Sequence, residues 1–262
     1  MAQVRPGHPA DPDLSGSPGR LNDQNGVVLD EIDTTSPRGS LALRLCDAIQ
    51  RRWPAEVLAI GVRGSVAHAD DTETSDVNLI VVTYRPRTGP RPALRKVDGV
   101  PVDLAVLAAD EAIAQARQLT PRWPLLADRY LTTMPLHDPR GCFRELREAH
   151  QNLLAEARPA EYAQLARHNW AIANGARQRA VRLTQWYDTD AALVLIAQAR
   201  VNAALVAGFL THTWFRNAAD AVRRTGVAAA DMQELGAILK YQAEELAARG
   251  RPVDGTLGAL FD

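Results

Sequence analysis

The sequence predicts an α+β fold, in which a small mixed β-sheet with flanking helices is followed by an all-helical C-terminal domain. Two observations support this prediction. In the first half, short runs of β-branched and apolar residues are separated by turn-forming residues. From Asp110 onward, Ala, Leu, Gln, Arg and Glu recur at helical spacing, with breaks at positions such as Pro135 and Gly226. The periodicity of the chain therefore changes between its two halves.

The first ordered element we expect is a helix that begins at Ser36 and Pro37. Ser is a favoured N-cap residue and Pro suits the first helical turn, while Pro54 stops the helix. Residues 1–35 precede it. The first 20 residues are rich in Pro, Gly, Ser and Asp and lack the apolar core of a signal peptide, so we expect a disordered tail over residues 1–35.

Two strands with a turn between them are expected next. Residues 57–62 form a short apolar run that ends at Gly64 and Ser65, and the small residues that follow predict the start of a helix. Residues 76–84 form the second strand. Two further runs, at residues 94–97 and 100–107, are separated by Asp98-Gly99, a strong hairpin signal.

These elements give three predicted segments. Residues 1–35 form the tail, residues 36–138 form the sheet-containing domain, and residues 139–262 form the helical domain.

Three polar side chains are expected to converge at one end of this sheet. Residues two apart on a strand point to the same face, so Asp76 and Asn78 project side by side. Asp103 lies on a strand that should pair alongside, and the Gly64-Ser65 turn adjoins it. Backbone amides and a hydroxyl at such a turn can hold a phosphate, and grouped oxygen ligands suit Mg²⁺. Asp103, between Val102 and Leu104, is best explained by a ligand or a cation, because a carboxylate is rarely buried without a partner.

Composition narrows the class of protein. The 262 residues carry a formal net charge of −1 and are 46% hydrophobic, so we expect no nucleic-acid partner and a globular core. The two cysteines are far apart and lack metal-ligand spacing. Even the most apolar stretch, residues 191–215, is interrupted by polar residues, so we expect no membrane span and a cytoplasmic location.

The segment GSVAHADDTETSDVNLIVV followed by VDLAV resembles the signature of the nucleotidyltransferase superfamily. Together with IGVRGS and WPLLADRYLTTMPLHD, it is similar more narrowly to the kanamycin nucleotidyltransferases, which are aminoglycoside 4′-adenylyltransferases. The resemblance implies a nucleotidyltransferase domain over the sheet and a homodimer with active sites between subunits. It also implies Mg²⁺-dependent transfer of a nucleoside monophosphate from a nucleoside triphosphate, such as ATP, to a hydroxyl group of a small polar molecule, an aminoglycoside or another natural product.

Carried over residue by residue, the resemblance assigns roles to several positions. Gly64 and Ser65 would contact the triphosphate, and Asp76 and Asp103 would be acidic members of the metal and catalytic cluster. His68 stands where the kanamycin enzymes carry an Arg of the turn, so it is the third expected nucleotide contact.

Two further departures concern the chemistry. Asn78 replaces the second carboxylate, and a neutral amide oxygen cannot offset the charge of Mg²⁺. The general-base Glu and the Lys four residues later align with residues that cannot move a proton, which are Ala171 or Ile172 and Gly175 or Ala176. Glu161, His168 and Arg177 are the nearby candidates to substitute for these two residues.

Three hypotheses follow. The first is an enzyme that transfers a nucleoside monophosphate with Mg²⁺ held by Asp76, Asn78 and Asp103. The second is a catalytically degenerate homologue that binds a ligand or a partner. The third, a minimal nucleotidyltransferase of the toxin–antitoxin type, is disfavoured by the long helical half.

Overall fold

A computed structural model describes residues 31–250 and 252–253 of the chain. Residues 1–30 of the tail predicted over residues 1–35 lie outside the described residues. Within them, the strands are β1 Val57–Arg63, β2 Val77–Thr83, β3 Ala93–Val97, β4 Val100–Ala108 and β5 Met134–His137. The helices are α1 Pro37–Arg52, α2 Ala109–Ala116, α3 Trp123–Leu131, α4 Cys142–Glu156, α5 Pro159–Gln185, α6 Thr189–Thr211, α7 Ala218–Arg224 and α8 Met232–Ala248.

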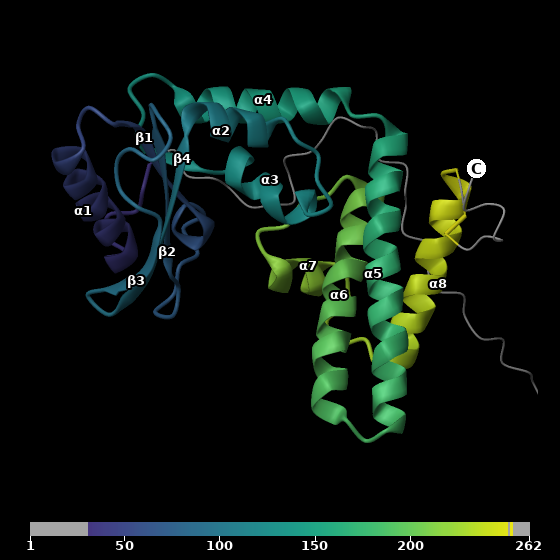
Figure 1. Ribbon diagram of the computed structural model, residues 1–262. Coiled ribbons are helices and arrows are strands. Elements are labelled where there is room, and N and C mark those ends of the chain that lie inside the picture. The colour runs from purple at the N-terminus through teal and green to yellow at the C-terminus, as the bar shows by residue number, and fades with distance from the viewer. Residues whose placement is uncertain (1–30, 251, 254–262) are drawn as a thin grey trace, which may run out of the picture.

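The strands form one mixed sheet in the order β3-β4-β2-β1-β5. β2 and β4 run parallel, and the other neighbours run antiparallel. Helix α1 covers one face, where Leu41 packs with Ile60 and Leu79. Helices α2 and α4 cover the other face, where Phe143 packs with Ile80. Figure 1 shows these layers, which confirm the predicted α+β class with a small mixed sheet and flanking helices.

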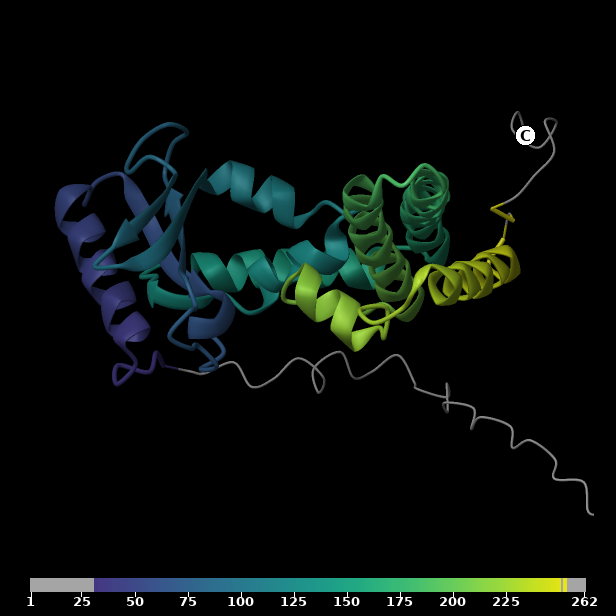
Figure 2. The same cartoon turned by 90° about the horizontal axis from the view of Figure 1, so that it is seen from below.

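Helix α3 connects the sheet to the helical half of the molecule. Helices α5 and α6 pack along each other and α8 lies against α5, so this end of the molecule is helical, and the sheet lies at the other end (Figures 1 and 2). Helix α3 takes part in both cores, because Trp123 belongs to the helical core and Tyr130 belongs to a core of the sheet. The two ends of the molecule therefore share α3.

One strand was missing from the predicted set. The expectation of helices broken at Pro135 was wrong over residues 134–137, where β5 pairs with β1. Pro donates no backbone hydrogen bond, and it is tolerated here because β5 is an edge strand. Four residues are too few for a periodicity to be read from the sequence.

The helix expected directly after the Gly64-Ser65 turn was also wrong. A short 3-10 turn, Gly64–Val66, follows β1, and the next α-helix along the chain is α2. The carbonyl of Ser65 accepts hydrogen bonds from the backbone N–H groups of His68 and Asp70, which closes the turn. The polar segment beyond it, residues 70–76, has no apolar face to bury and therefore forms a loop.

The domain boundary predicted at residues 138 and 139 stays a prediction. Helix α4 begins just beyond it, and its residues Cys142, Phe143 and Leu146 belong to the sheet core.

Helix α6 is the one described helix whose length and composition would suffice to cross a membrane. Of its most apolar window, 39% is buried, where it packs against the neighbouring helices of the helical half.

Candidate functional site

The sheet register brings the predicted site residues together. Asn78 of β2 is paired with Arg63 of β1 on one side and with Asp103 of β4 on the other. Residues directly opposite one another on neighbouring strands point to the same face. The three side chains therefore share one face of the sheet at the start of β2, beside the Gly64-Ser65 turn.

The carboxylates of Asp103 and of Asp76, which directly precedes β2, are each bonded to a nitrogen donor. Arg63 Nη2 lies 3.0 Å from Asp103 Oδ2, in an ion pair whose side chains are 24% and 39% exposed. Asn78 Nδ2 donates a hydrogen bond to Asp76 Oδ1 at 2.9 Å. The site is thus a charged and amide cluster in which each acid already has a partner.

Burial and neighbouring charges act on the guanidinium of Arg63. Burial lowers the pKa of Arg63 and nearby Arg129 lowers it further, whereas Asp103 and Asp128 oppose this shift. An arginine remains protonated at neutral pH despite such a shift. Arg63 Nε is buried and has no hydrogen-bond partner among the described residues. A permanent positive charge therefore sits between the turn and the carboxylates.

The backbone of the Gly64-Ser65 turn is accessible because Gly64 has no side chain. Gly64 has φ +70°, which favours glycine, and a Cβ added there would lie 3.4 Å from Asn78 Nδ2. The Ser65 side chain is partly exposed, and its hydroxyl has no hydrogen bond to another described residue. This hydroxyl is available to a ligand.

Two anchors on α1 hold the loop that leads from the turn to Asp76. Arg38 is buried, and its Nε donates to the carbonyl of Ser75 at 2.6 Å while its Nη2 donates to the carbonyl of Glu73. The Ser36 hydroxyl donates to Asp71 Oδ2 at 2.6 Å. The position of Asp76 is thereby fixed by the N-terminal end of α1.

A third anchor comes from the helical half. Arg216, which lies between α6 and α7, forms an ion pair with Asp70 at the beginning of the same loop. The loop therefore touches both ends of the molecule.

His68 does not face the solvent. Its side chain is fully buried, with Nε2 3.3 Å from Asp128 Oδ1, and Asp128 also accepts a hydrogen bond of 2.7 Å from the Thr132 hydroxyl. His68 Nδ1 is buried without a hydrogen-bond partner among the described residues. The geometry gives His68 the role of fastening the turn to α3, and its predicted contact with a nucleotide stays a prediction.

The residues of α5 considered as substitutes for a general base have structural partners or lie exposed. Glu161 accepts the backbone N–H of Arg158 at 3.0 Å as a helix cap, and Arg177 Nε donates to the carbonyl of Met232 at 2.7 Å. His168 is exposed. Ala171, Ile172, Gly175 and Ala176 lie along the middle of the same helix.

Sequence reasoning missed Arg63, Asp128 and Arg129 as members of this cluster. Arg63 stands directly before the turn, and its position opposite Asn78 depends on the antiparallel register of β1 and β2. Asp128 and Arg129 come from α3, whose contact with the turn is a tertiary feature. The sequence feature that could have indicated Arg63 was its position at the end of β1, two residues after Gly61.

The donor set does not fit a Mg²⁺ site as it stands. Within the described residues, no group of three His, Cys, Asp or Glu side chains is placed to hold a metal. Mg²⁺ prefers an octahedron of oxygens. Here the two carboxylates are bonded to the Arg63 guanidinium and to the Asn78 amide nitrogen.

No protein-family model and no curated protein matches this chain. Among solved structures, it is similar to a nucleotidyltransferase-like protein from Exiguobacterium sibiricum 255-15. The likeness covers 79% of this chain and 75% of that chain, with 12% sequence identity and a TM-score of 0.41. Because both the identity and the TM-score are low, the function is inferred below from the chain's own residues.

Proposed function

We propose that this chain is a nucleotidyltransferase-type protein that binds a nucleoside triphosphate at the Gly64-Ser65 turn without requiring a divalent cation. The observation that carries this proposal is the ion pair of Arg63 with Asp103 at 3.0 Å. A guanidinium is planar, permanently charged and suited to phosphate oxygens. Arg63 therefore supplies positive charge at the place where the resemblance expects a metal ion.

The charges around the turn support binding of an anion. Asp76, Asp103 and the buried Asp128 contribute three negative charges, and Arg63 and Arg129 contribute two positive charges close by. A cluster of carboxylates alone would repel a triphosphate. The guanidinium groups of Arg63 and Arg129 offset part of this repulsion, and the Ser65 hydroxyl adds a hydrogen-bonding group.

The same residues argue against efficient transfer. A general base typically contributes about 10² to 10⁴-fold to a rate, and one well-placed electrostatic group contributes about 10² to 10³-fold. Asn78 stands at the second acidic position, and the middle of α5 carries Ala171, Ile172, Gly175 and Ala176 where the resemblance expects the base and the Lys. We therefore infer that binding is the main activity of the site.

Replacement of Arg63 tests this proposal. In the presence of EDTA, Arg63→Gln is expected to weaken ATP binding about tenfold, because one charge-assisted contact is lost and Asp103 is left uncompensated. The measurement is isothermal titration of the full chain. Arg44→Gln is a matched control, because Arg44 forms a similar ion pair of 2.9 Å with Asp98 at an exposed position. Unchanged or tighter binding by Arg63→Gln would overturn the proposal.

A second candidate is Mg²⁺-dependent transfer of a nucleoside monophosphate to a hydroxyl group of a small polar molecule. It is favoured by the register that places Asn78 directly opposite Asp103 on neighbouring strands. Pyrophosphate release from a panel of triphosphates and hydroxylated acceptors, with Mg²⁺ present, tests it. Release above the rate of a Ser65→Ala, Asp103→Ala double variant would support transfer, and its absence would leave binding alone.

The resemblance also leads us to propose a homodimer. Light scattering of the purified chain, whose monomer has a mass of 28.6 kDa, measures this directly. A monomeric mass at micromolar concentration would contradict it.

A further inference from the structure

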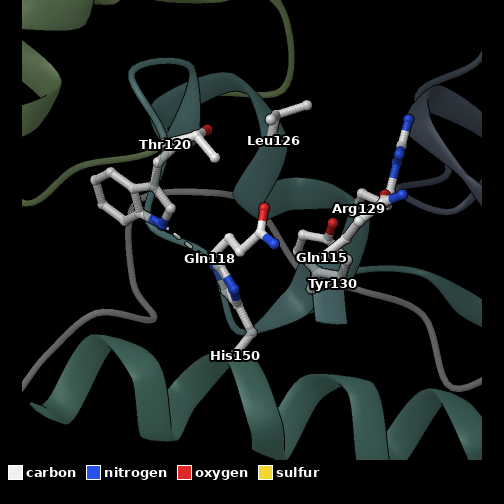
Figure 3. Close-up of a pocket in the computed structure, with 8 residues that line it drawn as sticks. Gln115, Gln118, Thr120, Leu126, Arg129, Tyr130 and His150 are labelled. Carbon is white, nitrogen blue, oxygen red and sulfur yellow. Dashed lines mark hydrogen bonds between the residues drawn. The ribbon is translucent and has the colours of Figure 1, made fainter. Parts of the chain in front are cut away.

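A cavity of about 190 Å³ lies between α2, α3 and α4, apart from the Gly64-Ser65 turn. Its walls come from the end of α2, the segment after it, one face of α3 and one residue of α4. The eight lining residues are Gln115, Gln118, Thr120, Trp123, Leu126, Arg129, Tyr130 and His150. Figure 3 shows His150 reaching up from its helix, with the side chains of Gln115 and Gln118 above it.

The polar atoms of His150 and Trp123 are already paired with each other and with the backbone. The Trp123 indole N–H donates to His150 Nε2 at 3.2 Å, and His150 Nδ1 lies 2.8 Å from the carbonyl of Ala116, to which it donates. Burial lowers the pKa of His150, so the ring is neutral at physiological pH. Trp123 and His150 are therefore uncharged and fully bonded parts of the cavity wall, and they are 2% and 1% exposed.

Other lining groups remain available for recognition. Thr120 Oγ1 is buried and has no hydrogen-bond partner among the described residues. Gln115 and Gln118 are exposed amides that can donate or accept. Arg129 forms no ion pair with a carboxylate among the described residues. Burial raises the pKa of the neighbouring Tyr130, and the charge of Arg129 and a hydrogen bond from it oppose this rise. The cavity thus combines a largely apolar wall with a hydroxyl, two amides and one cation.

The charged residue that lines the cavity is a cation. Of its eight lining residues, none is an Asp or a Glu and one is an Arg. A polyamine would find no carboxylate here to balance its charge, whereas a carboxylate ligand would find a guanidinium able to bind both of its oxygens. The cavity therefore selects against a cationic ligand.

The size of the cavity limits the ligand to about one ring. A cavity of about 150 Å³ lined by apolar side chains admits benzene, and this one is about 190 Å³. We propose that it binds a small single-ring monocarboxylate bearing a hydroxyl group, with the carboxylate on Arg129, the ring beside the half-buried Leu126, and a hydrogen bond to Thr120. Arg129 also belongs to the charged cluster at the Gly64-Ser65 turn, but this inference does not require that cluster to bind a triphosphate.

Three probes that differ in charge test the proposal on the full chain. Dissociation constants of 4-hydroxybenzoate, 4-hydroxybenzamide and 4-hydroxybenzylamine are measured by ligand-detected NMR titration. We expect the acid to bind about tenfold more tightly than the amide, because a charged hydrogen bond replaces a neutral one, and the amine to bind most weakly. Equal binding of acid and amide, or binding of none at millimolar concentration, would overturn the proposal.

Two variants locate the binding. Arg129→Gln is expected to abolish the difference between acid and amide, whereas the exposed Arg122→Gln, seven residues from Arg129 and outside the cavity, is expected to keep it. Leu126→Trp fills the cavity and is expected to remove binding of all three probes, so the test stands even if Arg129→Gln does not fold. Loss of discrimination in Arg122→Gln, or continued binding by Leu126→Trp, would contradict the assigned site.

Discussion

The pairing of Arg63 with Asp103 sets the chemistry of the site at the scale of single residues. A guanidinium 3.0 Å from one carboxylate, and an amide nitrogen 2.9 Å from the other, satisfy the two acids without a metal. Asn78 lies between Arg63 and Asp103 in the register. The residue type at position 78 therefore decides whether the cluster contains two or three carboxylates beside the turn.

Changing Asn78→Asp is expected to convert the cluster toward metal binding. A third carboxylate adds a hard oxygen ligand beside Asp103, so affinity for Mn²⁺ should rise about tenfold or more, and ATP binding in EDTA should weaken because negative charge increases. Isothermal titration measures both quantities. Asn152→Asp, at an exposed position of α4, is the control. If Mn²⁺ affinity does not change in Asn78→Asp, Asp103 and Asn78 do not share a site.

Asp128 is expected to stabilise the fold through its buried contacts. It is 4% exposed and bonded to Thr132 Oγ1, with His68 Nε2 at 3.3 Å. Asp128→Ala leaves His68 Nε2 buried without its partner, whereas the Thr132 hydroxyl keeps its bond of 2.9 Å to the backbone carbonyl of residue 128, so the free energy of unfolding should fall by about 2 kcal/mol. Urea denaturation checks this, with the exposed Asp47→Ala as the control. A change as small as that of Asp47→Ala would show that the contact contributes little.

The sequence alone was sufficient to place Asp76, Asn78 and Asp103 near the Gly64-Ser65 turn, because strand periodicity and the hairpin signal fix which residues share a face. It was not sufficient for Arg63, whose contact with Asp103 spans 40 positions and two strand pairings. The buried contacts made by α3 likewise could not be predicted from local sequence patterns.

At the scale of elements, the loop over residues 70–76 depends on α1. Arg38→Ala removes two hydrogen bonds to the carbonyls of Ser75 and Glu73, so this loop should open more readily. Hydrogen exchange of a peptide covering residues 70–76 is expected to speed up several-fold. Arg51→Ala, on the same helix but bonded only to Asp47 of its own helix among the described residues, is the control.

Unchanged exchange of that peptide in Arg38→Ala would mean that other contacts hold the loop. The capping signal at Ser36 correctly predicted the start of α1. It could not predict that the helix start also anchors a loop 35 positions away, because the Ser36–Asp71 contact is a tertiary one.

β5 marks the limit of sequence reasoning about elements. A four-residue strand containing Pro135 carries no readable period, and it exists because β1 offers a free edge. Helix α1 and strands β1 to β4 were predicted with boundaries within a few residues of those observed, because their sequence patterns extend over more residues or end at clear turn signals.

At the scale of the whole molecule, α3 joins the two cores. Trp123 lies in the helical core and Tyr130 in the sheet core, so neither core is complete without this helix. We expect the described fold to unfold in one cooperative transition.

Paired core substitutions test this cooperativity. Leu79→Ala in the sheet and Leu239→Ala in the helical half remove side chains that are 0% and 2% exposed, and each should cost about 2–5 kcal/mol. Both are expected to lower the midpoint of the same thermal transition, followed by far-ultraviolet circular dichroism and by tryptophan fluorescence. Two transitions, each moved by one substitution alone, would show that the two cores unfold independently.

The measurement that tests the central claim most directly is a calorimetric titration of the unaltered chain with ATP, first in EDTA and then in excess Mg²⁺. Because Arg63 already provides the cation beside Asp103, we predict binding in EDTA with an affinity that changes by less than about threefold when Mg²⁺ is added. Binding that appears only with Mg²⁺, or no binding under either condition, would contradict the account.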